Sequence, residues 1–492
     1  MSVELKLKLL CAAEIAEAVG GRLMTYFDAS DRDEQNAIST SSADCGRGVI
    51  FCAIKGARAD GHDYIADAIK LGSTCFICER VPESAVDVGR PFCAIVVEDT
   101  IKAIGALASY YRGFSTAKFV GITGSVGKTT TKEFIYAVAS AAFKTHKTLG
   151  NYNNELGLPL TIFGIEPEDR VVVLEMGMSD LGEIENMTKI ARPDIAVITN
   201  IGTSHLASLG TRENICRAKM EIRLGLPEDG VLILNADEPL LFTQYEELQK
   251  KPKLMSVYNR FGDFRAVNIR QKVDGIVYDL IYSNKAVTNV EIPALGKHNV
   301  YNSLAAYAVG IHLGMNDEQI RRGLLAFVSA DKRQNVYDVG GITVIDDCYN
   351  ASPESMRAAI DVLTSMAAKK NTRAAALLGD MLELGDYSRL MHVQLGQYAA
   401  QMQIDKLFCY GMMADIVAES AIKKGIRADN VFVCVDTRDA QGMADMILQT
   451  LDPGDILLVK ASRGIQAERI IECMKKRRTK KRSASPRKTN SK

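Results

Sequence analysis

The sequence predicts an α/β protein of three domains. These are a small mixed α/β N-terminal unit, a central doubly wound, mainly parallel sheet with a phosphate-binding loop (P-loop), and a Rossmann-like α/β domain at the C-terminal end. Three observations support this. A chain of 492 residues is too long for one hydrophobic core. Gly-bounded apolar runs alternate with helical periodicity, which is typical of a parallel sheet. The runs also lack polar alternation, as expected for strands buried on both faces.

The first segment, residues 1–100, reads as the mixed α/β unit. Its first twenty residues place acidic and basic residues among apolar ones, which predicts an amphipathic helix rather than a secretion signal. Helical spacing recurs at 62–72, and short apolar runs lie at 48–56, 73–80 and 92–99.

The second segment, residues 101–330, opens with a predicted helix at 101–113. Buried strands are predicted at 118–124, 171–177, 194–202 and 230–237, each followed by helical periodicity. The third segment, residues 331–474, repeats this pattern, which predicts a second, smaller parallel sheet. Its expected strands lie at 341–348, 374–380, 406–411, 430–435 and 455–462.

Charge separates a tail, residues 475–492, from the body. The tail holds ten basic residues and no acidic ones, although the whole chain balances 60 Lys and Arg against 60 Asp and Glu. Such a tail is typically disordered. It would suit nucleic acid or anionic lipid, but we expect a solvated tail without a dedicated partner and no required nucleic acid.

The remaining composition is that of a cytoplasmic protein. No stretch approaches the roughly 20 apolar residues that span a bilayer, so no transmembrane segment is expected. Without an export signal, the 11 cysteines are expected to be reduced thiols.

A Gly-rich loop lies between a predicted strand and a predicted helix at 118–134. Such a loop turns backbone N–H groups toward one point, where the helix dipole favours an anion. A lysine and a hydroxyl at the helix start can then hold phosphate oxygens and magnesium. The spacing is a variant of the usual P-loop, and by itself does not separate a ligase from a kinase or a GTPase. The loop residues are Thr123, Gly124, Ser125, Val126, Gly127, Lys128 and Thr129.

Two polar residues follow strands of the same predicted sheet. Glu175 lies near the end of one strand and His205 follows another. Because ligands collect at the carboxyl ends of parallel strands, both are expected near the P-loop, where they would hold a divalent cation. Taken singly, His205 would more often be a hydrogen-bonded loop residue. Lys219, on a predicted helix with an apolar face, would normally be a solvated side chain.

Nine motifs, in one order along the body of the chain, resemble those of the Mur ligase family. The most specific are G-N-Y-N-N-E-L-G-L-P-L-T, D-D-C-Y-N-A-S-P-E-S-M and L-G-D-M-L-E-L-G. The motifs lie at 123–132, 150–161, 175–178, 198–205, 218–222, 296–306, 346–356, 378–385 and 458–464.

The resemblance implies a bacterial, ATP- and Mg²⁺-dependent ligase, expected to be a monomer. Its substrates would be UDP-N-acetylmuramoyl tripeptide and D-alanyl-D-alanine, joined through an acyl phosphate to give a precursor of peptidoglycan. Three segments would contribute to one site, so domain closure is expected to exclude water.

The resemblance also implies residue roles. Thr129, Glu175 and His205 would serve magnesium, with Lys219 as a carbamate, and Asn299 and Asn302 would read adenine. Asp347 would face the ribose, while Arg333 would reach the γ-phosphate. Asn153 and Asn154 would lie beside the muramoyl substrate, Asn350 beside the dipeptide, and Ser462 near the substrates. The expected catalytic groups are Lys128, His205, Lys219, Arg333 and Lys460.

The uridine region would comprise 39–43 and 55–63, with Ser41 and Ser42 among the contacts. Here Ser41-Ser42-Ala43 replaces the family's usual D-S-R, which removes an acid and a guanidinium. Lys332 stands where the family usually has Gly before Arg333. None of the departures removes a phosphate or metal group.

Some alternatives stay open. Asp347 and His392 are candidate bases for the amine, although His392 is more often a structural helix residue. A sister ligase with another amine acceptor, or a folate polyglutamylating enzyme, would share the chemistry, but folate enzymes lack the uridine-binding unit. An alternative outside the ligases is a P-loop ATPase that binds a partner through the basic tail.

Overall fold

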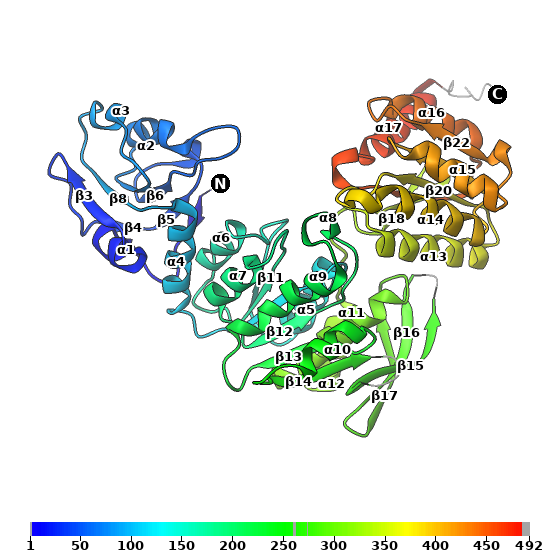
Figure 1. The fold of residues 1–492 in the computed structure, drawn as a ribbon, viewed down its shortest axis with the longest axis horizontal. Helices are drawn as coiled ribbons and strands as arrows, with labels where there is room; N and C mark the ends of the chain where they lie inside the picture. The colour runs from blue at the N-terminus through cyan, green and yellow to red at the C-terminus, as the bar shows by residue number, and fades with distance from the viewer. Residues whose placement is uncertain (1, 259–261, 273, 485–492) are drawn as a thin grey trace, which may run out of the picture.

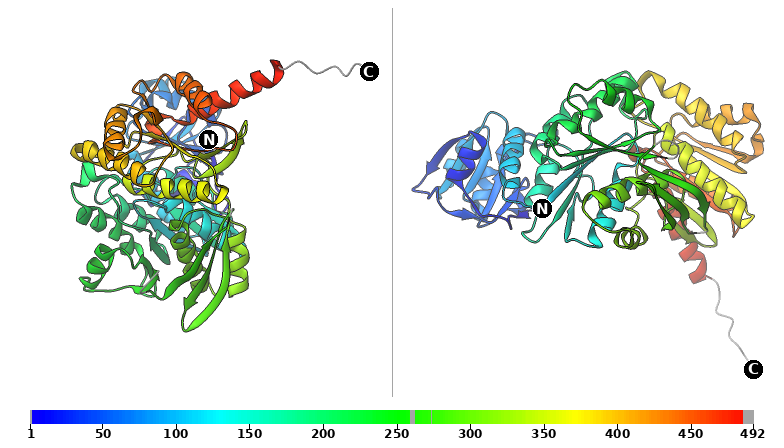
Figure 2. Two further views of the ribbon diagram at one scale, coloured as in Figure 1. Left: turned by 90° about the vertical axis from the view of Figure 1, so that its right-hand side faces the viewer. Right: turned by 90° about the horizontal axis from the view of Figure 1, so that it is seen from below.

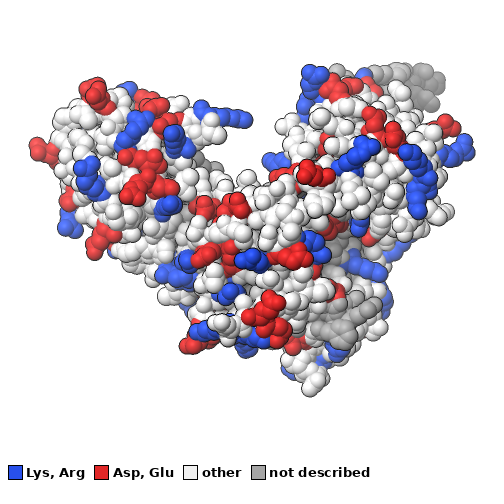
Figure 3. Space-filling view, viewed as in Figure 1, with Lys and Arg blue, Asp and Glu red and all other residues white. Residues whose placement is uncertain are grey.

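The computed structural model describes residues 2–258, 262–272 and 274–484. Three α/β domains follow one another, with the first and third at opposite ends of the central one (Figure 1). The space-filling view shows a hollow between the first and third domains (Figure 3). The predicted fold class is confirmed.

The first domain is a six-stranded sheet in the order β1-β5-β6-β7-β8-β3, parallel from β5 to β8 and antiparallel at both edges. The predicted runs form β6, β7 and β8, and the predicted helix forms α2. The elements are β1 Val3–Glu4, β2 Leu10–Cys11, α1 Ala12–Val19, β3 Arg22–Tyr26, β4 Glu34–Gln35, β5 Ala37–Ser39, β6 Val49–Cys52, α2 Ile65–Leu71, β7 Cys75–Cys78, α3 Glu83–Val86 and β8 Phe92–Val96.

The expected N-terminal helix over the first twenty residues was wrong in its extent. The helix begins only at Ala12, and Val3 instead pairs with Ile38 across β1 and β5. Apolar and charged residues alternate strictly from Val3 to Leu9. That period of two belongs to a strand rather than a helix.

The central domain is a nine-stranded sheet in the order β10-β11-β9-β12-β13-β14-β15-β16-β17. Strands β10 to β15 pair in parallel, and β15, β16 and β17 pair antiparallel. The elements are α4 Thr100–Arg112, β9 Lys118–Thr123, α5 Lys128–Ser140, β10 Thr145–Lys147, α6 Gly157–Phe163, β11 Val171–Glu175, α7 Glu183–Ala191, β12 Ile195–Ile198, α8 Leu206–Leu209, α9 Arg212–Met220, β13 Val231–Asn235, α10 Pro239–Glu246, β14 Lys253–Tyr258, β15 Phe264–Gln271, β16 Ile276–Tyr282, β17 Lys285–Ile292, α11 His298–His312 and α12 Asp317–Leu325.

Helix α4 joins the first domain to the central one. Asp99 caps it by accepting hydrogen bonds from the backbone of Ile101 and Lys102 at 2.9 and 3.0 Å. Tyr111, fully buried, accepts a hydrogen bond through its hydroxyl from the Leu7 backbone at 2.9 Å. One hydrophobic cluster includes residues of both domains and of α4, so the first domain is packed onto the central one.

The third domain is a six-stranded sheet in the order β18-β19-β23-β20-β21-β22, parallel except for the β18–β19 hairpin. All five strands predicted here are present. The elements are β18 Asn335–Val339, β19 Ile342–Asp346, α13 Pro353–Lys370, β20 Ala374–Gly379, α14 Ser388–Gln401, β21 Lys406–Tyr410, α15 Ala414–Lys424, β22 Val431–Cys434, α16 Ala440–Thr450, β23 Ile456–Lys460 and α17 Glu468–Ala484.

The tail that we predicted to be disordered from Lys475 continues α17 as far as Ala484. That helix extends away from the body of the molecule (Figure 2). Ile470, Ile471 and Met474 bury its first turns, and lysine, arginine and alanine, all good helix formers, let it continue. The prediction for residues 485–492 lies outside the described residues.

Within the described residues, no helix is both long and apolar enough to cross a bilayer. All 11 cysteines are unpaired. Cys75 and Cys78 form a C-x-x-C pair, but they lie on opposite faces of β7 and belong to different hydrophobic clusters.

Candidate active site

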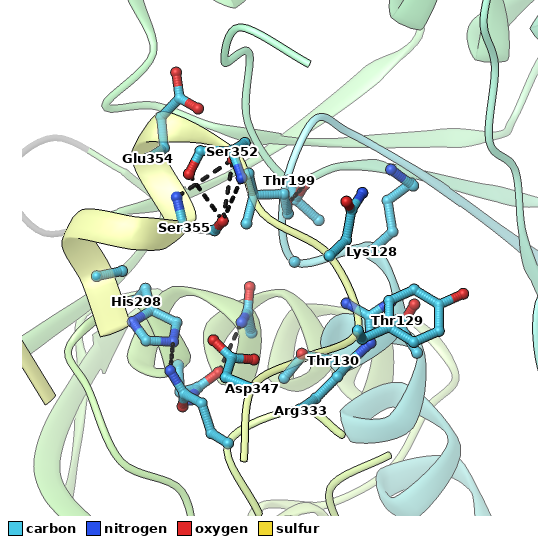
Figure 4. Close-up of a pocket in the computed structure, with 18 of the residues that line it drawn as sticks. Lys128, Thr129, Thr130, Thr199, His298, Arg333, Asp347, Ser352, Glu354 and Ser355 are labelled. Atoms are coloured by element: carbon cyan, nitrogen blue, oxygen red, sulfur yellow. Dashed lines mark hydrogen bonds between the residues drawn. The ribbon is translucent and has the colours of Figure 1, made fainter. Parts of the chain in front are cut away.

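A cleft of about 920 Å³ is lined by residues of the central and third domains. Figure 4 shows Lys128 and Thr129 of the central domain around the same cavity as Arg333 and Asp347. Most of the residues predicted from the sequence line this cleft: Ser125, Val126, Gly127, Lys128, Thr129, Asn153, Asn154, Glu175, His205, Asn299, Asn302, Arg333, Asp347, Asn350 and Lys460.

The P-loop joins β9 to α5. Gly124 and Gly127 have φ of 146° and 85°, which L side chains rarely adopt. A Cβ on Gly124 would lie 1.9 Å from the Thr199 hydroxyl. Lys128 donates a hydrogen bond to the Gly124 carbonyl at 2.7 Å, and burial lowers the pKa of its ammonium. The lysine of the P-loop is therefore hydrogen-bonded to the backbone of the loop itself.

The segment after β12 braces the P-loop from the side. The Asn200 amide accepts a hydrogen bond from the Val126 N–H and donates one to the Val126 carbonyl, both at 2.9 Å. The Ser125 hydroxyl, by contrast, is buried without a hydrogen-bond partner in the described structure. A buried hydroxyl without a partner is rare, and a phosphate oxygen in the loop would satisfy it.

Glu175, buried at the end of β11, connects three elements. Its carboxylate accepts hydrogen bonds from the Thr129 hydroxyl at 2.8 Å and from the Asn153 amide at 2.9 Å. The Lys132 ammonium lies 3.8 Å away. Our sequence reasoning missed Lys132, which is 2% exposed; its place one turn after Lys128 on the same helix was the available signal.

The surroundings of His205 and Lys219 both favour the uncharged form of the side chain. Burial, and then the charges of Lys128 and Lys219, lower the pKa of His205 to about 4. Burial, and then the charge of Lys128, lower the pKa of Lys219 well below its usual value. Lys219 is 1% exposed, so the usual expectation of a solvated lysine was wrong here.

The donors near the P-loop fit a magnesium ion only in combination. The described residues hold no group of three His, Cys, Asp or Glu side chains that would bind a metal by itself. The Thr129 hydroxyl, the Glu175 carboxylate and the uncharged His205 imidazole are ligands of the kinds that can coordinate a divalent ion beside phosphate.

Asn299 and Asn302 connect α11 to the P-loop helix. The Thr131 hydroxyl donates to the Asn302 side-chain oxygen at 3.1 Å. The Asn302 amide in turn donates to the Asn299 side-chain oxygen at 2.9 Å. Both asparagines are buried and line the cleft. A Cβ on Gly127 would lie 3.0 Å from the Asn302 side-chain oxygen, so Asn302 lies directly against the P-loop.

Arg333 is fixed at the junction of the two domains. Its neighbours Lys332 and Gln334 have φ of 57° and 54°. Its guanidinium carbon lies 4.0 Å from the Tyr349 ring centroid, and that of Arg463 lies 5.2 Å from the same centroid. Lys332, in place of the family's usual glycine, donates to Glu468 at 2.8 Å. We had not predicted Tyr349 or Arg463, because their contact with Arg333 arises only in the folded chain.

A buried ion pair closes the third-domain side of the cleft. Lys460, 2% exposed at the end of β23, donates to Asp347 at 2.7 Å and to the Asn350 carbonyl at 2.9 Å. The pair places both predicted side chains at the carboxyl edge of the third sheet, where ligands of α/β proteins bind.

The other predicted residues lie outside the cleft lining. The Ser462 hydroxyl, buried, accepts a hydrogen bond from the Leu382 backbone at 2.9 Å. Ser41 and Ser42 belong to the first domain. His392 is structural, as its place in a helix suggested. Its Nδ1 hydrogen-bonds the Ser388 carbonyl at 2.7 Å, and its Nε2 accepts from the Met381 backbone at 3.0 Å.

Family models match most of the chain. Residues 35–112 match the Mur ligase family catalytic domain, residues 122–310 the Mur ligase middle domain, and residues 332–463 the Mur ligase glutamate ligase domain.

Named relatives are similar along nearly their full length. UDP-N-acetylmuramoyl-tripeptide–D-alanyl-D-alanine ligase of Bacillus subtilis is 37% identical over 463 residues, covering 93% of this chain and 96% of that one. A crystal structure of MurF from Acinetobacter baumannii superposes with a TM-score of 0.85 at 32% identity, covering 95% and 99% of the two chains. MurF ligase from Thermotoga maritima in complex with ADP gives a TM-score of 0.79 at 29% identity, covering 90% and 98%.

Proposed function

The chain belongs to the Mur ligase family, and from that premise we propose that it joins D-alanyl-D-alanine to UDP-N-acetylmuramoyl tripeptide, using ATP. ATP would phosphorylate the tripeptide carboxylate, and the dipeptide amine would displace the phosphate. The products are the UDP-linked pentapeptide, ADP and inorganic phosphate. We propose that the protein works as a monomer in the bacterial cytoplasm and supplies peptidoglycan synthesis.

One observation carries the proposal. The P-loop of the central domain and the basic groups of the third domain line one cleft. Lys128 is close enough to Arg333 for that charge to help lower its pKa, after burial. A phosphoryl group in transfer carries negative charge on its outer oxygens, and positively charged groups on two sides of it stabilise that charge.

Each residue has a part in this chemistry. Lys128 and the loop Thr123–Thr129 would hold the phosphates, and Arg333 would reach the transferred group from across the junction. Lys460, which donates to Asp347 at 2.7 Å, would hold that side chain oriented toward the ribose. Asn299 and Asn302 would contact adenine. Magnesium, when bound, supplies positive charge to the phosphate oxygens. Its ligands would be Thr129, Glu175, His205 and a carbamate on Lys219.

Carbamate formation suits the environment of Lys219. Carbon dioxide adds to a neutral amine, and the N–H proton that is lost leaves a carbamate anion. The Lys219 side chain is buried, and that burial lowers its pKa. The carbamate would place a negative charge near Lys128, whose positive charge helps to lower the pKa of Lys219.

The substrates would reach the cleft from two sides. Asn153 and Asn154 would contact the muramoyl tripeptide, whose uridine end would lie on the first domain near Ser41 and Ser42. Asn350 would contact the dipeptide, and Ser462 would support that wall through its hydrogen bond to the Leu382 backbone at 2.9 Å. Closure of the hollow between first and third domains (Figure 3) would then exclude water from the acyl phosphate.

Release of inorganic phosphate tests the function. The enzyme is incubated with ATP, Mg²⁺ and UDP-N-acetylmuramoyl tripeptide, with and without D-alanyl-D-alanine. We expect sustained phosphate release only when the tripeptide and D-alanyl-D-alanine are both present. Phosphate and pentapeptide should then form in equal amounts. Release that is independent of the tripeptide would indicate a P-loop ATPase instead. Release with the tripeptide and another amino acid, but not with the dipeptide, would indicate a sister ligase.

A further inference from the structure

Lys132 is a buried cation that the proposed chemistry does not use. It lies on α5 one turn after Lys128, and its side chain is 2% exposed. Its ammonium donates to the Thr148 carbonyl at 2.9 Å and lies 3.2 Å from Glu133 and 3.8 Å from Glu175. The residues that line the cleft include Lys128 and Glu175 but not Lys132. Lys132 therefore supports the wall of the site from behind.

The contacts of Lys132 belong to a closed triangle of three residues. The Thr148 carbonyl accepts from Lys132, and the Thr148 hydroxyl accepts a hydrogen bond from the Glu175 backbone at 3.0 Å. The Glu175 carboxylate completes the triangle by its 3.8 Å distance from the Lys132 ammonium. Thr148 follows β10, and Glu175 ends β11. Because the triangle is closed, none of its corners can shift without straining the other two contacts.

The stretch that begins at Thr148 forms part of the cleft wall. It runs to Asn153 and Asn154, which both line the cleft. The Asn153 amide donates to one oxygen of the Glu175 carboxylate at 2.9 Å. The other oxygen accepts from the Thr129 hydroxyl at 2.8 Å and faces the ammonium of the triangle. A displacement of this carboxylate would therefore disturb the tripeptide side and the phosphate side of the cleft together.

Stability alone does not account for an ammonium at this position. Removing an ammonium from water is unfavourable, and apolar side chains of similar volume are often equally stable in place of buried ionic groups. Glu133 is also paired with Lys147, whose side chain is 21% exposed, so it keeps a cation without Lys132. A role in fixing the cleft wall explains the buried charge better than neutralisation of Glu133 does.

Building on the proposed function, we propose that Lys132 is a positioning residue for the tripeptide. It holds the stretch 148–154 and Glu175 against the P-loop helix. Asn153 and Asn154 would thereby present the reacting carboxylate of the tripeptide at a fixed place relative to the phosphates. Lys132 acts through these residues and itself touches neither substrate.

Direct binding separates this role from a general role in folding. Calorimetry measures the Kd of UDP-N-acetylmuramoyl tripeptide on enzyme saturated with Mg²⁺ and the non-hydrolysable ATP analogue AMP-PNP, and separately the Kd of ADP without metal. We compare the wild type, Lys132→Met, Asn153→Ala and the variant that combines both. Methionine has a similar volume without the charge. Lys147→Met is the matched control, because Lys147 is the other lysine paired with Glu133 and is outside the cleft lining.

Lys132→Met should raise the Kd of the tripeptide by about 10-fold or more, comparable to the loss of a hydrogen bond to a charged group. The Kd of ADP should stay within about twofold of the wild type, as expected for an independent site, since the hydrogen bonds of Lys128 and Asn200 in the P-loop do not involve Lys132. Lys147→Met should match the wild type. Adding Asn153→Ala to Lys132→Met should cost much less than the two single effects combined, because the lysine acts through the asparagine.

Thr148→Val loosens the triangle at a second corner and provides the test if Lys132→Met does not fold. Valine keeps the carbonyl that Lys132 binds but removes the hydroxyl that accepts from the Glu175 backbone. No buried charge loses its partner in this variant. It should also weaken tripeptide binding and leave the Kd of ADP unchanged.

Four results would overturn the inference. The first is an unchanged tripeptide Kd in Lys132→Met or, should that variant not fold, in Thr148→Val. The others are an equal rise in the Kd of ADP, fully independent effects of Lys132→Met and Asn153→Ala, or an equal loss of tripeptide binding in Lys147→Met. Failure of the wild type to bind the tripeptide or to form the pentapeptide would instead overturn the proposed function itself, so the two failures are distinguishable.

Discussion

At the scale of single residues, a fully buried lysine is difficult to keep charged. Desolvation disfavours its ammonium, and another positive charge nearby disfavours it further. Lys219 experiences both, from its burial and from Lys128. A side chain of this kind either remains a neutral amine or is converted to an anion, and an anion would be stabilised by the nearby charge of Lys128.

Replacing Lys219 by Ala should therefore lower turnover by on the order of 100-fold or more, since a metal ligand and its charge are lost. Small carboxylates such as formate or acetate should restore part of the activity by entering the vacated space. Steady-state phosphate release measures both effects. Arg217→Ala is the control, because Arg217 is exposed on the same helix. Unchanged turnover in Lys219→Ala would defeat the carbamate proposal.

Gly124 gives a second residue-scale prediction. Gly124→Ala should reduce turnover by on the order of 100-fold, because the new methyl group would displace Thr199 and shift the loop against the phosphates. Binding of a fluorescent ATP analogue and turnover report the change. Gly89→Ala also has positive φ but meets nothing within 4 Å. It should cost only about 1 kcal/mol of stability and leave turnover intact.

The P-loop residues could be predicted because their chemistry depends on neighbours in sequence. Gly124, Gly127, Lys128 and Thr129 follow one another between a strand and a helix, so local spacing specifies the site. Tyr349, by contrast, contributes to the site by contacting two arginines that are 16 and 114 residues away along the chain. Local patterns contain no information about such a contact.

At the scale of helices and strands, buried parallel strands were the easiest to predict. Strands such as β9, β11 and β23 are continuous apolar runs, because helices cover both of their faces. The hairpins β15 to β17 were not predicted. The sequence of β15 mixes apolar and polar residues, and its positions are buried, partly exposed and exposed. It therefore shows neither a continuous apolar run nor a strict alternation, the two patterns that predict a strand.

The ends of β19 and β23 supply an element-scale prediction. Lys460→Met removes one partner of a buried ion pair and leaves Asp347 uncompensated, with a side chain only 12% exposed. The loss should be about 3–5 kcal/mol, seen as a lower urea midpoint. Asp347→Asn combined with Lys460→Met should recover part of it. A single variant as stable as the wild type would show that the pair does not hold the two strand ends together.

At the scale of the whole molecule, the site exists only when the central and third domains meet. Glu354, at the start of α13, reaches across to Thr203 in the segment that also braces the P-loop. Two hydrogen-bonded contacts, Thr203 to Glu354 and Thr199 to Val126, therefore connect the third domain to the phosphate site through this segment. The arrangement of domains could not be predicted from the sequence, because it depends on a few side-chain contacts between surfaces that are each compatible with solvent.

Glu354→Ala should loosen this junction. The KM for ATP should rise by about tenfold, the effect of losing a hydrogen bond to a charged group, and the radius of gyration with bound ATP should increase in small-angle X-ray scattering. Glu354→Gln should show a smaller effect, because its amide oxygen still accepts from Thr203. Unaltered scattering together with an unaltered KM would show that this contact does not govern closure.

The central claim is that the converging domains activate a carboxylate by transferring phosphate to it. Transfer of oxygen tests this most directly. Tripeptide with ¹⁸O in its reacting carboxylate is converted with D-alanyl-D-alanine, and the released phosphate is analysed by mass spectrometry. Cleavage of the C–O bond of an acyl phosphate predicts one ¹⁸O atom in each phosphate formed per peptide bond. Phosphate without ¹⁸O would contradict the account, because the carboxylate would then never have been phosphorylated.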